Sequence, residues 1–82
     1  MENWPIVNEQ LEKEFEFHDF LKAVNFINRI SVLAEEADHH PDLFLHSYNK
    51  VRVSMMTHSK GKITHKDNAL ADKIDFIFKS KP

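Results

Sequence analysis

The chain has 82 residues, a formal net charge of −2 and no cysteine. This length predicts one domain over residues 1–82, and the lack of cysteine excludes disulfides, thiolate metal ligands and cysteine nucleophiles. The slightly acidic balance gives no electrostatic footprint for nucleic acid or for an anionic membrane. No apolar run approaches the roughly 18 residues that span a bilayer, and the first residues do not resemble a signal peptide. We therefore expect a cytoplasmic protein.

Two strands are expected at the start of the chain. Residues 4–7 are short and apolar, and Asn8-Glu9 can turn the chain back. Residues 11–17 then alternate between apolar and acidic side chains, with Lys13 interrupting the apolar side. This alternation is typical of a strand with one face in water, as in an antiparallel sheet.

A long helix is expected next. Apolar residues recur at steps of three and four from Phe20 to Ala37, which predicts an amphipathic helix. Asp19 is favourable near its start. Pro41 cannot continue a helix, and the residue before a proline avoids helical angles, so the helix should end near residues 38–40.

The second half of the chain repeats this order. Residues 43–48 and 51–58 are expected to form strands, and residues 60–62 a loop. Thr64-x-x-Asp67 resembles a capping box with Asp in place of Glu, and it precedes a helical pattern over residues 69–78.

These elements give the order β-β-α-β-β-α. Two hairpins and two helices predict an α+β fold, a four-stranded antiparallel sheet with both helices packed on one face. The edges of such an open sheet are free to pair with a second subunit. A domain of this size is only marginally stable alone, so a homo-oligomer, at least a dimer, is expected.

Histidines dominate the middle of the chain. His39 and His40 follow the first helix, His58 ends the last strand, and Asp67 and Glu35 lie near them in the sequence. Histidine is the side chain whose ordinary pKa lies closest to neutrality, so this set suits proton transfer. Three other histidines have no partner by spacing and are interpreted as ordinary surface residues: His18, His46 and His65.

Two kinds of chemistry compete for this cluster. The pattern His-His-x17-His-x8-Asp could supply nitrogen and oxygen ligands to zinc or non-haem iron. Adjacent histidines tend to diverge, however, and ligand pairs are usually spaced by about two to four residues. The alternative is acid–base catalysis without a metal. We favour this alternative and expect neither a metal nor a cofactor.

The histidine region resembles the pterin-4a-carbinolamine dehydratase family. The matching pattern is Glu35-x3-His39-His40-Pro41, Tyr48-Asn49-Lys50-Val51, Thr57-His58 and Gly61-x-Ile63-Thr64-x-x-Asp67. The flanks agree as well, in Trp4, Phe15-x-Phe17-x-Asp19-Phe20, and Ala69-Leu70-Ala71 with Ile74. The likeness spans almost the whole chain.

The resemblance implies an enzyme, a hydro-lyase with helices on one side of an antiparallel sheet, that forms dimers or dimers of dimers. Its reaction converts 4a-hydroxytetrahydrobiopterin to quinonoid dihydropterin and water, which recycles the tetrahydropterin cofactor of aromatic amino acid hydroxylases. Hydroxide leaves C4a while a proton leaves N5, and imidazoles suit both transfers.

The resemblance also suggests roles for single residues. His39 and His58 would be acid and base in an order that the sequence leaves open, and His40 would orient the pterin. Glu35 and Asp67 would hold imidazole tautomers or bind the pterin ring edge. The substrate site would be lined by Asp38, His39, His40, Met56, Thr57, His58 and Ser59.

Two features depart from the family pattern. Leu43 stands where the family usually has Trp, and the helical N-terminal extension of longer members is lacking. Some animal members also serve as dimerisation cofactors of a homeodomain transcription factor. A non-catalytic interaction module on the same fold is therefore the alternative function.

Overall fold

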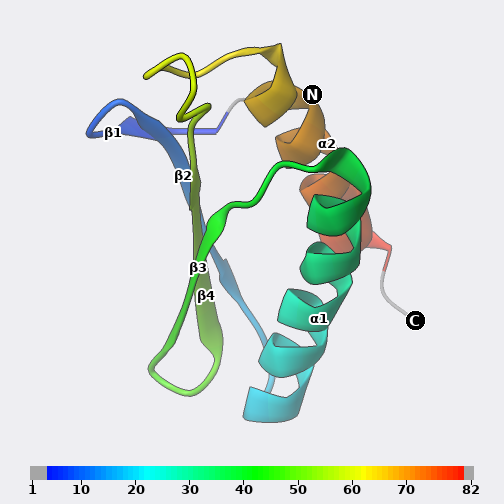
Figure 1. Cartoon of the computed structure of the whole chain (residues 1–82). Coiled ribbons are helices and arrows are strands. Elements are labelled where there is room, and N and C mark those ends of the chain that lie inside the picture. Colours follow the sequence, from blue (N-terminus) through cyan, green and yellow to red (C-terminus); the bar gives the residue numbers. More distant parts are fainter. Residues whose placement is uncertain (1–3, 81–82) are drawn as a thin grey trace.

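The structure is a computed structural model that describes residues 4–80 (Figure 1). Its four strands form one sheet in the order β1-β2-β4-β3, with antiparallel neighbours throughout. The expected α+β class and the order of helices and strands are confirmed. The elements are β1 (Ile6–Val7), β2 (Gln10–Glu16), α1 (Phe20–Ala37), β3 (Asp42–His46), β4 (Lys50–Met55) and α2 (His65–Lys79).

The central strand β2 pairs with β4 from Leu11 to Glu16, and its alternate side chains enter the core. Leu11 and Phe15 are buried, and they pair with Met55 and Val51 of β4. Lys13 lies on the same side of β2, and its Nζ donates to Asp75 Oδ1 of α2 at 2.9 Å. The apparent interruption of the apolar side is therefore a partly buried ion pair between sheet and helix.

The turns explain where the expected boundaries were wrong. The strand expected over residues 43–48 ends at His46, because Ser47 and Tyr48 adopt positive φ angles of 51° and 56° that reverse the chain. The strand expected over residues 51–58 ends at Met55. Thr57 instead forms an isolated bridge with Lys62, so His58 lies in the turn between them.

Both helices cover one face of the sheet, and the core lies between the two layers (Figure 1). Phe15 of β2 contacts Phe26 of α1, with ring centroids 5.0 Å apart, and Ile30 and Ile74 are fully buried. The opposite face of the sheet carries polar contacts. Within residues 4–80 no helix is long and apolar enough to cross a membrane.

Candidate functional site

The C-terminal end of α1 fixes the position of His39. The helix ends at Ala37, just before the end predicted near residues 38–40, and Asp38 follows in the left-handed conformation with φ 51°. The backbone N–H of Asp38 donates to Glu35 and that of His39 donates to Ala34, at 3.3 and 3.1 Å. This Schellman arrangement satisfies the last carbonyls of the helix and turns His39 back over the helix end.

The first turn of α2 fixes the position of Asp67. Thr64 is the N-cap, and the expected capping box with Asp67 is present. The backbone N–H of Thr64 donates to Asp67 Oδ2 at 2.8 Å. The cap therefore holds one oxygen of a side chain that is completely buried.

Asp67 also joins the helix ends to the end of the sheet. Its Oδ1 lies 2.6 Å from His39 Nε2, and its Oδ2 accepts the Thr57 hydroxyl at 2.7 Å. The hydroxyls of Thr57 and Thr64 lie 2.6 Å apart. Because the single proton of Thr57 goes to the carboxylate, Thr64 must donate to Thr57. A directed chain of hydrogen bonds thus ends on Asp67.

The environment of Asp67 decides its charge. Burial raises the pKa of this carboxyl, but hydrogen bonds from the Thr64 backbone, His39 and Thr57 lower it, and the net pKa lies below its ordinary value. Asp67 is therefore ionised at neutral pH and can only accept hydrogen bonds. It follows that His39 donates through Nε2, and in the neutral ring Nδ1 is left as an acceptor.

His40 and Glu35 form a second, more exposed pair. His40 Nε2 lies 2.7 Å from Glu35 Oε2, and the side chains are 56% and 78% exposed. Exposed pairs of this kind add little stability, so the contact matters chiefly for the orientation of the ring.

His58 lies in the tight turn after β4. The turn is closed by hydrogen bonds from the Lys60 N–H to the Thr57 carbonyl and from the Gly61 N–H to the His58 carbonyl, at 3.0 and 3.1 Å. Gly61 has φ +66°, a conformation that costs glycine little. The His58 ring is exposed, and it follows directly after the buried Thr57 that bonds to Asp67.

The expected site residues gather at one end of the molecule. Figure 1 shows the end of α1, the turn after β4 and the start of α2 at the same end of the fold. Asp67 contacts both His39 and Thr57, so three segments distant in sequence meet at one carboxylate. Asp38 and Ser59 are exposed and Met56 is half-buried around this point. No hydrogen bond within residues 4–80 joins the His40–Glu35 pair to Asp67.

The remaining histidines have different surroundings. His65 lines a small cavity of about 180 Å³ that also touches His39. His46 is half-buried, and its Nε2 lies 2.6 Å from Glu14 Oε1 on the open face of the sheet. That contact lowers the pKa of Glu14, although desolvation opposes it. His18 is exposed at the other end of the fold.

Three further observations bear on the sequence interpretation. Thr64 was recognised only as a helix cap, although its hydroxyl also supports Thr57 beside the histidine site. The sequence signal for this second role was the capping box Thr64-x-x-Asp67, because its acidic residue also belongs to the histidine pattern. Leu43 is partly buried and packs against the core. Among residues 4–80 no group of three His, Cys, Asp or Glu side chains is arranged to hold a metal ion.

Comparison with known proteins gives consistent matches over most of the chain. The family model described as pterin 4 alpha carbinolamine dehydratase matches residues 1–77. A provisionally named pterin-4-alpha-carbinolamine dehydratase from Sulfurisphaera tokodaii is 47% identical, covering 92% of this chain and 80% of that protein. A protein of the same provisional name from Prochlorococcus marinus is 42% identical, covering 95% and 81%.

A solved structure shares the fold and much of the sequence. A transcriptional coactivator/pterin dehydratase from Brucella melitensis is 36% identical with a TM-score of 0.84, covering 92% of this chain and 81% of that chain. A pterin dehydratase-like RuBisCO assembly factor of the alpha-carboxysome shares the fold alone, at 21% identity and a TM-score of 0.73. On the family match and these identities, the chain belongs to the pterin-4a-carbinolamine dehydratase family.

Proposed function

We propose that this chain dehydrates pterin-4a-carbinolamine by histidine acid–base catalysis. The C4a–O bond breaks, the N5–H proton leaves, and a C4a=N5 double bond forms with release of water. Family membership supports the reaction. The observation that carries the mechanism is the contact between His39 and the buried, ionised Asp67.

His39 is assigned as the base. Its Nε2–H is committed to Asp67, so the lone pair on Nδ1 is available to accept the N5 proton. The imidazolium formed would face a carboxylate that is already ionised, which stabilises the charge developing during the reaction. His58 is then the acid that protonates the leaving hydroxide, because it follows directly after Thr57 at the same end of the fold.

The other residues of the site have supporting roles in this proposal. His40, aligned by Glu35, hydrogen-bonds the pterin ring. Asp38 and the segment Met56 to Ser59 line the substrate. Positioned general acid–base catalysis contributes on the order of 10² to 10⁴ in rate, so loss of either transferring imidazole should be easy to measure.

A turnover assay tests the reaction and separates the alternatives. Purified protein is mixed with synthetic 4a-hydroxytetrahydropterin, and formation of the quinonoid product is followed with and without a chelator. We expect turnover that the chelator does not change. Loss of turnover on chelation would favour a metal enzyme. No turnover at all would favour the interaction module, the alternative that matches the first half of the coactivator/dehydratase name of the Brucella protein.

Self-association is the second part of the proposal, as a homodimer or homotetramer. β3 is an edge strand, and Phe44 on it and Tyr48 just after it are 53% and 65% exposed. Leu21 and Val32 of α1 are also exposed apolar side chains. An unpaired edge with apolar neighbours favours pairing with a second copy. Light scattering at micromolar concentration tests this, and a monomer would contradict it.

A further inference from the structure

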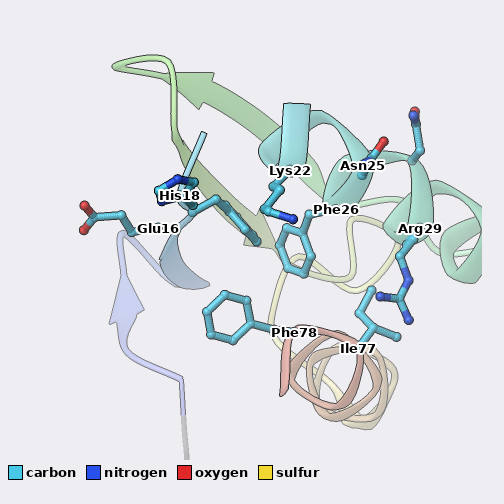
Figure 2. Close-up of a pocket in the computed structure, with 10 residues that line it drawn as sticks. Glu16, His18, Lys22, Asn25, Phe26, Arg29, Ile77 and Phe78 are labelled. Atoms are coloured by element: carbon cyan, nitrogen blue, oxygen red, sulfur yellow. The ribbon is translucent and has the colours of Figure 1, made fainter. Parts of the chain in front are cut away.

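A second hollow lies at the end of the helices away from the histidines. It has a volume of about 560 Å³ and is lined by residues from three segments, 16–18, 22–29 and 77–78 (Figure 2). These segments are the end of β2 with the residues after it, the first half of α1 and the end of α2. Because α1 spans 18 residues, about 27 Å, its two ends present separate sites. We term this hollow the helix groove.

The floor of the helix groove is aromatic. Phe17 and Phe26 have ring centroids 4.9 Å apart, and Phe78 lies 5.5 and 5.8 Å from them. Phe26 is buried, whereas Phe17 and Phe78 are only partly covered. Ile77 extends the apolar surface along α2. Such a floor favours the apolar or aromatic body of a ligand.

The rim of the helix groove is polar, with more positive than negative charge. Arg29 projects from α1 toward Ile77 of α2, and the Lys22 side chain ends beside Phe26 (Figure 2). Glu16 is the one carboxylate among the residues that line the groove. Among residues 4–80 neither cationic side chain of the rim forms an ion pair. These cations are therefore free to bind an anion.

We propose that the helix groove binds a small amphipathic monoanion, with an apolar or aromatic body and one carboxylate. The body lies on Phe17, Phe26 and Phe78, and the carboxylate meets Arg29 and Lys22. The guanidinium fork of arginine matches carboxylate geometry, and its hydrogen bonds to an anion are stronger than neutral ones. The volume lies in the range of about 300–1,000 Å³ that small-ligand pockets occupy. The proposal is independent of the histidine chemistry.

Titration of the full chain with 4-phenylbutyrate and with its neutral amide, followed by NMR of the backbone amides, tests this inference. We expect saturable shifts over residues 16–18, 22–29 and 77–78 with the carboxylate, and about tenfold weaker binding of the amide. The double variant Lys22→Gln with Arg29→Gln should weaken carboxylate binding by about tenfold or more. Arg52→Gln removes a cation from the open face of the sheet and should leave carboxylate binding in the groove unchanged.

Four results would overturn the proposal. Equal affinity for the acid and the amide would show that the charge of the ligand does not contribute to binding. Unchanged binding by the double variant would show the same for Lys22 and Arg29. Shifts centred on His39 and His58 instead would place the ligand in the other site. Shifts of the groove amides on dilution of the ligand-free protein would show that a second copy of the chain occupies the groove.

Discussion

His39 Nε2 and Asp67 Oδ1 lie 2.6 Å apart, although 28 residues separate them in the chain. The bond ties the end of α1 to the first turn of α2. The second oxygen of Asp67 is held by the Thr57 hydroxyl and the Thr64 backbone, so the carboxylate cannot turn away from the imidazole. The orientation of His39 is therefore set by the cap of another helix.

Asp67→Asn should lower turnover by about 10² to 10⁴. The amide keeps the shape of the side chain, but its nitrogen would face His39 Nε2 if its oxygen keeps the bonds from Thr57 and Thr64. The imidazole would then have to accept at Nε2 and carry its proton on Nδ1, where a base is needed. Steady-state kinetics measures the loss, and ¹⁵N shifts of the His39 ring report the tautomer.

Asp72→Asn is the matched control for this variant. The substitution removes the same negative charge from α2, but Asp72 is not part of the network around Asp67. It should keep both the turnover and the His39 tautomer of the original chain. An Asp67→Asn protein with an unchanged tautomer and full turnover would contradict the assignment of His39.

The depressed pKa of Asp67 predicts loss of stability in acid. A carboxyl whose pKa is lower in the folded than in the unfolded chain contributes stability that is fully present above its unfolded value, near 3.8. That contribution is lost as the pH falls through the folded-state pKa. The melting temperature should therefore fall between about pH 5 and pH 2, and Asp67→Asn should flatten this dependence.

Glu14→Gln provides the comparison for the acid experiment. Glu14 also has a lowered pKa, through its contact with His46, but it lies in water on the open face of the sheet. Solvent screens such a pair, so its removal should change the pH dependence much less. If Glu14→Gln flattened the pH dependence of the melting temperature as strongly as Asp67→Asn, the hydrogen bonds to the buried Asp67 carboxylate would not be the source of the effect.

Sequence periodicity was sufficient for the architecture. The change from a two-residue to a three-to-four-residue period located α1, and Pro41 with the histidines located its end. The strand ends were less well predicted, because positive φ angles at Ser47 and Tyr48 leave little trace in the residue types. Lys13 interrupts the apolar side of β2 in the sequence pattern. The sequence could not explain it, because its partner Asp75 is remote in the chain.

The sequence predicted a set of site residues, not a network. Spacing indicated His39, His40, His58 and Asp67, and the family resemblance added Glu35. Neither could indicate that Glu35 pairs with His40 and Asp67 with His39, because those contacts depend on how the helix ends meet. The helix groove left no motif at all, since its floor comes from Phe17, Phe26 and Phe78, which are ordinary core positions in the sequence pattern.

The histidines should divide into two groups by their effect on turnover. His39→Ala and His58→Ala remove proposed proton-transfer groups and should each lower turnover by about 10² or more. His18→Ala and His65→Ala should change it little, since His18 lies at the other end of the fold and His65 is an exposed residue of α2. Kinetics of the four purified variants decides, and equal losses in all four would refute the assignment.

Leu43→Trp should destabilise the fold. Leu43 pairs with the fully buried Val53 of β4 and packs against the core, so a larger ring has to displace its neighbours. Overpacking of this kind costs about 1–3 kcal/mol, which for a domain of this size lowers the melting temperature by at least about 4 °C.

The same variant shows whether residue 43 also faces the pterin. Aromatic stacking adds about 0.5–1.5 kcal/mol, so a tryptophan that met the substrate would tighten pterin binding by a few-fold to about tenfold. Because Leu43 already packs against the core, we expect the loss of stability without tighter binding. Melting temperature and pterin affinity, measured on the same preparation, separate the two cases. Tighter binding at an unchanged melting temperature would place residue 43 in the wall of the substrate site, and no change in either would show that this position tolerates both side chains.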